Sequence, residues 1–250
     1  MKNKNFIFGI HSVFEVLKMR PQDVEQIVIA NNRTIKNVGN ILNLAKQFHV
    51  PVVYQEEAWF RRAGQMTHQG IVAEVRMKKE NSLDDILSQL KEQEVPGFFL
   101  VLDEITDPHN VGALIRSAAC AGVDAVILPK RGGAPLTSAV AKTSSGGMEH
   151  VAVISVSNIN YALNSLKKEG VWVMGLAAEA ERSLYDMPGA QAIALVVGNE
   201  EQGLRRLVRE NCDQLIKIPM AGVMDSLNAS VAGGIALFEI VRQRIDRGIK

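Results

Sequence analysis

Hydrophobic and polar positions follow two patterns along the chain, and the change falls near residue 97. Beyond it, short apolar runs rich in β-branched residues alternate with stretches that carry apolar residues at helical spacing. The runs lie at 98–102, 125–128, 151–154, 171–174, 192–197 and 215–218, and the helical stretches at 111–121, 137–143, 159–168, 203–210 and 227–246. Such runs are typical of strands buried on both faces of a parallel sheet. The pattern therefore predicts a doubly wound α/β domain.

The first 80 residues predict a smaller α/β domain. Apolar residues at helical spacing, from Ile10 to Leu17, predict a helix at 10–19. Strands are expected near 26–30, 51–54 and 71–75, with helices near 35–48 and 56–63. The polar segment that follows, 76–96, has one apolar stripe from Leu83 to Leu90, which predicts a short helix. We therefore expect one domain at 1–76, a linker at 77–96 and a second domain at 97–250.

Composition excludes several classes of protein. With 47% hydrophobic and 22% charged residues, the chain can bury a core, so disorder is excluded as the dominant state. Cys120 and Cys212 belong to no CxxC motif, which excludes a disulfide scaffold or zinc ribbon and favours a reducing compartment. No apolar stretch approaches the roughly 18–20 residues of a membrane span, and the charged N-terminus does not fit a signal peptide. We expect a soluble, cytoplasmic protein.

The net charge of +1 conceals an asymmetry. Residues 1–80 hold 12 Lys and Arg against 7 Asp and Glu, a net charge of +5, whereas residues 81–250 hold 16 against 20, a net charge of −4. This division indicates a module that faces nucleic acid, although an ordinary solvated basic surface has the same composition. Aromatic residues make up only 5% of the chain, which argues against a protein that binds mainly by stacking bases.

Several familiar motifs are absent. Neither GxGxxG nor GxxxxGKS/T follows an expected strand, which disfavours a dinucleotide oxidoreductase or a P-loop ATPase. The GxSxG elbow of serine hydrolases does not occur. His109 and His150 lack partners at metal-ligand spacing, so no metal site is expected.

Polar residues gather instead in three loops that follow expected strands. Such loops lie at one edge of a parallel sheet, where ligands bind. The residues concerned are Asn110, Arg116, Glu200, Ser226 and Asn228. Structural alternatives exist for single residues, since Asn110 can cap the helix at 111–121 and Ser226 the last helix, with Asn228 in its first turn. Together, the three loops predict a binding site.

Three segments of the chain resemble the three motifs of the SpoU (TrmH-like) family of RNA ribose 2′-O-methyltransferases, within the SPOUT superfamily. They read PHNVGALIRSAACAG, LVVGNEEQGLRR and IPMAGVMDSLNASVAGGIALFE, and they span about 97–246. In addition, the segments that begin at Phe8 (FGIHSV) and His68 (HQGIVA) resemble the N-terminal substrate-binding domain of a subgroup that methylates a guanosine of 23S rRNA.

The resemblance implies a SPOUT-type catalytic domain whose C-terminal segment forms a deep trefoil knot. It further implies S-adenosylmethionine as the cofactor, no metal, and a homodimer joined through the knot region, with Arg116 acting across the interface. The residues implied to bind the cofactor are Gly198, Asn199, Ile218, Met220 and Leu227.

The same resemblance implies that Arg116 takes part in methyl transfer. Because guanidinium is effectively always protonated, we expect Arg116 to orient the RNA phosphate and stabilise the developing alkoxide rather than to act as a base. The other polar residues, Asn110, Glu200, Ser226 and Asn228, would position Arg116, the ribose and the cofactor.

A basic N-terminal domain suits rRNA, which is bound through phosphate contacts and shape. The expected RNA-binding residues are Arg33, Lys36, Arg61, Arg62, His68 and Gln69. Two alternatives keep the fold and change the function: 2′-O-methylation of tRNA or of another rRNA nucleotide, and an rRNA-binding assembly factor without catalysis.

Overall fold

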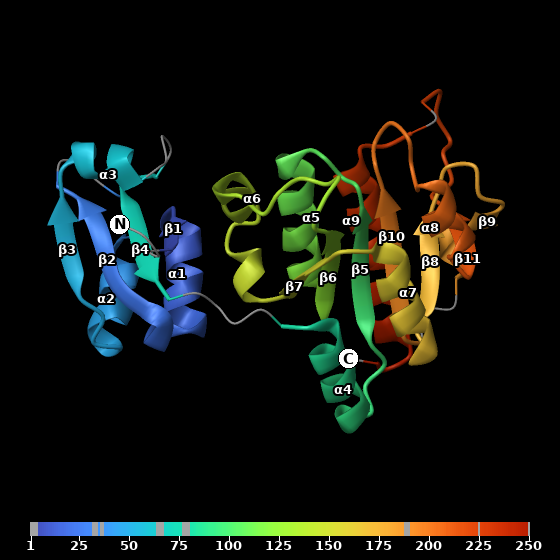
Figure 1. The fold of residues 1–250 in the computed structure, drawn as a ribbon, viewed down its shortest axis with the longest axis horizontal. Coiled ribbons are helices and arrows are strands. Elements are labelled where there is room, and N and C mark those ends of the chain that lie inside the picture. Colours follow the sequence, from blue (N-terminus) through green and yellow to red (C-terminus); the bar gives the residue numbers. More distant parts are fainter. Residues whose placement is uncertain are drawn as a thin grey trace.

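The computed structural model describes residues 5–31, 35, 38–63, 68–76, 81–187, 191–224 and 226–249. Within these residues the strands form one sheet of four and one sheet of seven, which lie side by side along the long axis of the molecule (Figure 1). None of the helices in this part of the chain has the length and hydropathy to cross a bilayer.

The small sheet is mixed and has the order β1-β4-β2-β3. Its strands are β1 (Asn5–Phe8), β2 (Val24–Ala30), β3 (Val52–Gln55) and β4 (Ile71–Val75), and its helices are α1 (Ile10–Met19), α2 (Val38–Gln47) and α3 (Glu57–Ala63). Because side chains alternate along a strand, Ile27 and Ile29 of β2 pack with α1 and α2, whereas Val28 packs with Phe60 of α3. The predicted helix at 10–19 and strand at 71–75 are confirmed; β1 was not predicted.

The large sheet is parallel throughout its described strands, as predicted. Its order is β7-β6-β5-β10-β8-β11-β9. The strands are β5 (Phe98–Asp103), β6 (Ala125–Pro129), β7 (Ala152–Val156), β8 (Trp172–Leu176), β9 (Arg182–Ser183), β10 (Ile193–Gly198) and β11 (Gln214–Lys217). Since β5 and β10 are neighbours whose following loops diverge, their carboxyl ends form a topological switch point, the usual ligand position in such sheets.

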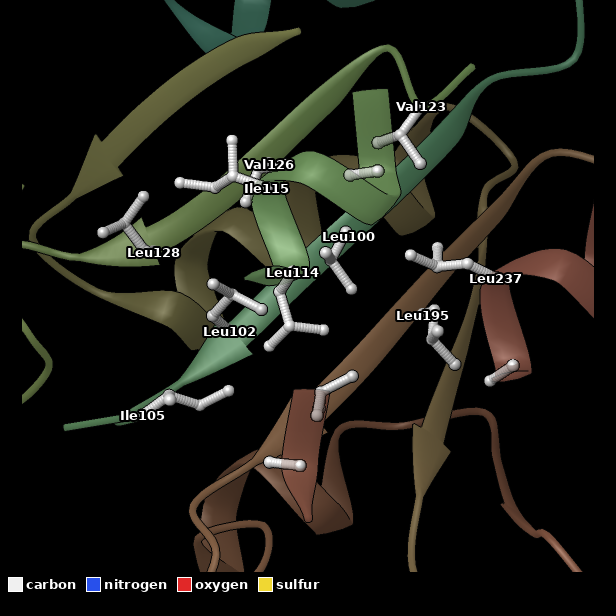
Figure 2. Packing of buried hydrophobic residues seen from close by; sticks show 14 of the residues in the cluster. Leu100, Leu102, Ile105, Leu114, Ile115, Val123, Val126, Leu128, Leu195 and Leu237 are labelled. Carbon is white, nitrogen blue, oxygen red and sulfur yellow. The ribbon is translucent and has the colours of Figure 1, made fainter. Parts of the chain in front are cut away.

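Helices cover both faces of the large sheet. They are α4 (Leu83–Gln93), α5 (Pro108–Ala121), α6 (Ser138–Thr143), α7 (Ile159–Lys168), α8 (Arg206–Glu210) and α9 (Ala229–Asp246), with 3₁₀ turns η2 (Gly147–Glu149) and η3 (Leu184–Asp186); a further 3₁₀ turn, η1 (Pro21–Asp23), joins α1 to β2 in the small sheet's part of the chain. On one face, Leu114 of α5 and Leu237 of α9 pack with Leu100 and Leu195 of the sheet (Figure 2). On the other, Leu163 of α7 packs in a core that α4 also contacts. The predicted helix within 77–96 is therefore α4, and it lies against the large sheet.

The C-terminal end of α9 fastens the amino ends of the two central strands. The Arg244 guanidinium is buried and donates to the carbonyl oxygens of Pro96, Gly97 and Gln191 at 3.0–3.2 Å. Its Cζ lies 4.6 Å from the centroid of the Phe98 ring. Burial lowers the pKa of Arg244, an effect that nearby Asp124 partly offsets. The last helix thus closes the sheet around β5 and β10.

Candidate functional site

Three polar side chains from three strand-end loops meet in one hydrogen-bonded chain. Asn110 lies in the first turn of α5 and is buried; its Nδ2 donates to Glu200 Oε1 in the loop after β10. Its Oδ1 accepts from Nδ2 of Asn228, at 3.1 Å, in the loop after β11. The single amide of Asn110 therefore joins the loops that follow β5, β10 and β11.

The helix caps differ from the expected ones, and the difference explains this geometry. Asn228, not Ser226, is the N-cap of α9, because its Oδ1 accepts from the backbone N–H groups of Ser230 and Val231. Asp107, not Asn110, caps α5 by accepting from His109 N at 2.9 Å. Because the side-chain oxygen of Asn228 caps α9, its NH₂ group is free to donate to Asn110. Asp107 caps α5, so both polar atoms of the Asn110 side chain can bond to the other loops.

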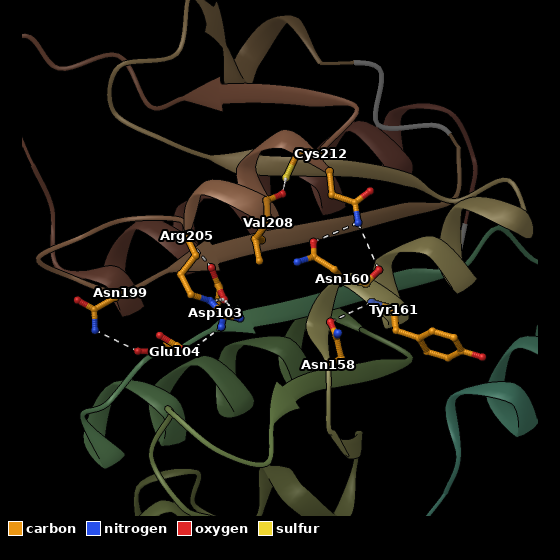
Figure 3. Close-up of polar contacts among 10 residues, drawn as sticks. Asp103, Glu104, Asn158, Asn160, Tyr161, Asn199, Arg205, Val208 and Cys212 are labelled. Atoms are coloured by element: carbon orange, nitrogen blue, oxygen red, sulfur yellow. Dashed lines mark hydrogen bonds and ion pairs between the residues drawn. The ribbon is translucent and has the colours of Figure 1, made fainter.

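An ion pair between the half-buried Arg205 and the buried Asp103 fixes the loop that carries Glu200. Arg205 donates from its backbone N and its Nε to the carboxylate of Asp103, at 2.9 and 2.7 Å, and Asp103 is fully buried at the end of β5 (Figure 3). At the start of the loop, Asn199 Nδ2 donates to the Glu104 carbonyl oxygen at 3.0 Å. Both ends of 199–205 are therefore held against β5. Sequence reasoning missed Asp103 and Arg205, although an Asp that ends a buried strand was a usable sign.

Gly198 and Gly203 allow this loop to close tightly. A Cβ added to Gly198 would lie 2.3 Å from the carbonyl carbon of Gly203, which real side chains do not tolerate. Gly203 itself has a φ of 65°, in the left-handed region that favours glycine. The backbone of the loop consequently approaches the end of β10 without any intervening side chain.

A cavity of about 700 Å³ opens beside the polar chain, between the loops after β8, β10 and β11. All five expected cofactor residues line it, together with Glu200 and Ser226: Gly198, Asn199, Ile218, Met220 and Leu227. Its apolar wall includes Leu176 and Val197, and charged side chains such as Glu179 and Lys217 border it. This size and this combination of an apolar wall with many polar groups suit a polar ligand of nucleoside size. The wall from 176 to 179 was not anticipated.

Arg116 does not join the polar chain within one copy of the protein. It is exposed on α5, six residues after Asn110 and so about 120° away around the helix axis. Its NH1 donates to Ser145 Oγ at 3.4 Å. The structure thus brings Asn110, Glu200 and Asn228 together, places the exposed Ser226 at the cavity, and leaves Arg116 on a separate face.

The expected RNA-binding residues fall into three groups. Arg61 and Arg62 are exposed in the last turn of α3. Gln69 is exposed, but its Oε1 accepts from Ile10 N at 3.0 Å and so holds the start of α1. Arg33 and Lys36 lie outside the described residues.

His68 was expected to contact RNA, but its side chain lies in the interior. Its ring is 2% exposed and stacks on Phe60, with 4.3 Å between centroids. Nδ1 accepts from Gly70 N at 3.0 Å, which places the proton on Nε2, and Nε2 then donates to Glu57 Oε1 at 3.0 Å. The imidazole therefore stabilises the small sheet from within rather than forming part of its surface.

Neither thiol chemistry nor a cluster of metal ligands is evident in the described part of the chain. Burial raises the pKa of the Cys212 thiol to about 12, so it is protonated at neutral pH. Among the described residues, no group of three or more His, Cys, Asp and Glu side chains could hold a metal ion.

Two family profiles match the chain. The profile of the SpoU rRNA Methylase family matches residues 97–238, and that of RNA 2′-O ribose methyltransferase substrate binding matches residues 6–81.

Curated relatives match over nearly the whole chain. The 23S rRNA (guanosine-2′-O-)-methyltransferase RlmB of Vibrio vulnificus is 41% identical over 97% of this chain and 98% of its own. RlmB of Escherichia coli K12 is 40% identical over 95% and 98%. The putative TrmH family tRNA/rRNA methyltransferase YacO of Bacillus subtilis is 38% identical over 96% of each.

Solved structures share the fold. The SpoU methyltransferase AviRb of Streptomyces viridochromogenes, in complex with AdoMet, has a TM-score of 0.80 at 22% identity, over 98% of this chain and 92% of that one. A putative RNA methyltransferase of the TrmH family from Porphyromonas gingivalis has a TM-score of 0.76 at 25% identity, over 97% and 91%. The arrangement of both sheets therefore has precedent among these proteins.

Proposed function

Since this chain belongs to the SpoU rRNA methylase family and is accordingly a methyltransferase, we propose that it methylates the 2′-hydroxyl of a guanosine ribose in 23S rRNA, with S-adenosylmethionine as donor. The observation that carries the proposal is the match of both parts of the chain, at about 40% identity, to enzymes named for that reaction. The cavity beside the Asn110–Glu200–Asn228 chain supplies a site of fitting size and chemistry.

The residues that line the cavity fit S-adenosylmethionine. We assign the cofactor to Gly198, Asn199, Ile218, Met220 and Leu227. Apolar side chains suit the adenine and the methionine stem, and the polar side chains of the lining, Asn199 among them, suit the polar parts of the cofactor. When bound, the cofactor supplies a methyl group on a sulfonium, which is open to attack by an oxygen nucleophile.

The protein's own contribution is orientation and electrostatics. The 2′-hydroxyl is a weak acid, so its oxygen needs stabilisation as the proton leaves. Arg116, permanently charged, would hold the RNA phosphate and stabilise the developing alkoxide. Asn110, Glu200 and Asn228 are fixed to one another and would position the ribose, with Ser226 at the rim of the cavity.

We propose that the active enzyme is a homodimer in which Arg116 acts on the cavity of a second copy. Arg116 lies apart from the polar chain of its own copy, and α9 exposes an apolar stripe with the helical spacing of a contact surface. The stripe consists of Val231, Ile235, Phe238 and Ile245. The C-terminal knot that the family resemblance implies is part of the same proposal.

We further propose that the N-terminal part, 1–76, binds rRNA and that 77–96 links it to the catalytic part, 97–250. The net charge of +5 on residues 1–80 and the exposed Arg61 and Arg62 support this role. An rRNA substrate implies a cytoplasmic location.

Methyl transfer from labelled S-adenosylmethionine tests the proposal directly. The substrates are rRNA and tRNA purified from a strain that lacks this gene, and the modified nucleotide is mapped afterwards. We expect one labelled guanosine in 23S rRNA. Label on tRNA alone would refute the substrate, and binding of rRNA without any transfer would indicate an assembly factor instead.

A further inference from the structure

One short segment of the large part of the molecule, residues 144–150, lies between the small sheet and Arg116. On the side of the small sheet, α1 and the turn after it contact this segment through two charged pairs. Arg20 donates from Nε and NH2 to the two carboxylate oxygens of Glu149, at 2.7 and 3.1 Å. His150 Nε2 lies 2.6 Å from Glu15 Oε2. The first pair is bidentate, a geometry that fixes orientation as well as distance.

The Arg20–Glu149 pair is shielded from water. The two side chains are 11% and 10% exposed. Burial disfavours the charge on Arg20, but the hydrogen bonds and charges of Glu149 and of Asp23, which lies 3.4 Å away, outweigh it, so the pKa of Arg20 is raised. Removal of Arg20 would leave Glu149 as a largely buried charge without this counterion, and removal of Glu149 would leave Arg20 with its longer pair to Asp23, so either change weakens the contact.

Backbone shape brings the two parts closer than most residues would allow. Gly146 has a φ of 88°, and a Cβ added there would lie 2.7 Å from Glu15 Cγ in α1. Gly146 therefore meets α1 directly because it has no side chain, His150 pairs with Glu15 of α1, and Glu149 pairs with Arg20, the residue that follows α1.

The opposite side of the same segment contacts Arg116. A Cβ added to Gly147 would lie 3.2 Å from Arg116 Cα, so the two backbones are in contact. Ser145, held at a φ of 50°, accepts from Arg116 NH1 through its Oγ. The segment 144–150 consequently connects α1, in the part expected to bind RNA, with the residue expected to act on it.

We propose that Arg20 and Glu149 are positioning residues, which lock the small sheet onto segment 144–150 and thereby set Arg116 relative to RNA held by the small sheet. This inference rests on the proposed function and deepens it. The pair acts on the rate of transfer, because a displaced phosphate or guanidinium loses its alignment with the reacting ribose. Affinity for RNA and for the cofactor comes from other residues and does not depend on the pair.

A double-mutant cycle on the full-length protein tests the proposal. The variants are Arg20→Ala, Glu149→Ala and the double variant, assayed for kcat, for KM of S-adenosylmethionine and for Kd of 23S rRNA. We expect kcat to fall about ten- to a hundred-fold in each, with both binding constants within about twofold of wild type. The double variant should lose no more than the worse single variant, since the two residues act through one contact.

Two milder variants separate positioning from folding. Glu149→Gln keeps the size of the side chain and removes its charge, and Arg20→Lys keeps the charge and loses the bidentate geometry. Both should unfold close to the wild-type temperature and have kcat values between those of wild type and the alanine variants. The matched control is Lys91→Ala, which breaks an exposed pair with Glu169 and should leave kcat unchanged.

The outcomes distinguish failure of the proposed function from failure of the positioning role of Arg20 and Glu149. A wild-type protein that transfers no methyl group would refute the proposed function. An active wild type together with unchanged kcat in Arg20→Ala and Glu149→Gln would refute the positioning role alone. A loss confined to RNA affinity would also refute it, because the pair would then belong to RNA binding.

Discussion

The two sheets use their polar side chains in opposite ways. At the carboxyl edge of the large sheet, the Asn110 amide bonds to both Glu200 and Asn228, beside a cavity that Glu200 helps to line. In the small sheet, the matching motif residues His68 and Gln69 are used up in holding its own turns and helix. In the small mixed sheet β1, β2 and β3 also run in one direction, but His68 and Gln69 bond to the backbone of their own domain instead of to one another. The side chains proposed to act in methyl transfer are therefore gathered at the large sheet, whereas the motif residues of the small sheet stabilise its own fold.

The sharpest test of that contrast is Arg116→Ala, for which we expect the largest effect. Loss of a preorganised positive charge should lower kcat about 10²- to 10³-fold. Affinity for S-adenosylmethionine, measured by calorimetry, should stay unchanged, because Arg116 is not among the residues that line the cavity. Methyl transfer at the wild-type rate would show that Arg116 takes no part in the reaction.

Arg205→Ala probes the support beneath the large-sheet site. It removes the guanidinium from the fully buried Asp103, which keeps the backbone N–H of residue 205 as a donor, and we expect the free energy of unfolding to fall by about 2 kcal/mol, with weaker cofactor binding as loop 199–205 loosens. The neighbouring Arg206→Ala is the control, since its pair with Glu210 is exposed and should contribute less than about 0.5 kcal/mol. Equal losses in chemical denaturation would contradict this account.

His68→Ala addresses the small sheet. Because the imidazole is buried, stacked and hydrogen bonded at both nitrogens, we expect a loss of about 1–2 kcal/mol in stability. The folded fraction should bind RNA with unchanged affinity and unchanged salt dependence. If the variant bound RNA more weakly but had wild-type stability, His68 would be a residue that contacts RNA.

Arg61→Ala is the complementary change and should have the smallest effect. It alters an exposed side chain, so stability should stay the same. If Arg61 contacts one phosphate, the slope of log affinity against log salt should become shallower by about 1. A slope identical to that of wild type would exclude the contact.

The difference between the sheets also decides how much could be predicted from sequence. Uninterrupted apolar runs predicted the strands of the large sheet except the two-residue β9, and strand order then brought Asn110, Glu200 and Asn228 to one edge. The strand β1 was missed because four residues carry little pattern, and its pairing with β4 bridges more than sixty positions. Local patterns describe elements and their ends, not pairings of this range.

Contacts between distant side chains were equally beyond prediction. The pairing of Asp103 with Arg205 and of Arg20 with Glu149 depends on which surfaces meet after folding. The cap of α9 was misassigned because Ser226 and Asn228 are both good N-cap residues, and only the bond to Asn110 selects one of them. His68 was misjudged because a polar residue in a motif has the same letters whether it faces solvent or the interior.

The central position of β10 has a consequence for synthesis. Its pairing joins Phe98 to Ile193, and a sheet built on such distant partners forms slowly and only after most of the chain exists. The small sheet is finished at residue 75 and can fold while the rest is still being translated. Asn228, which completes the polar chain, leaves the ribosome after every described strand of both sheets. Incomplete translation products can therefore hold a finished small sheet while lacking part of the proposed methyl-transfer site.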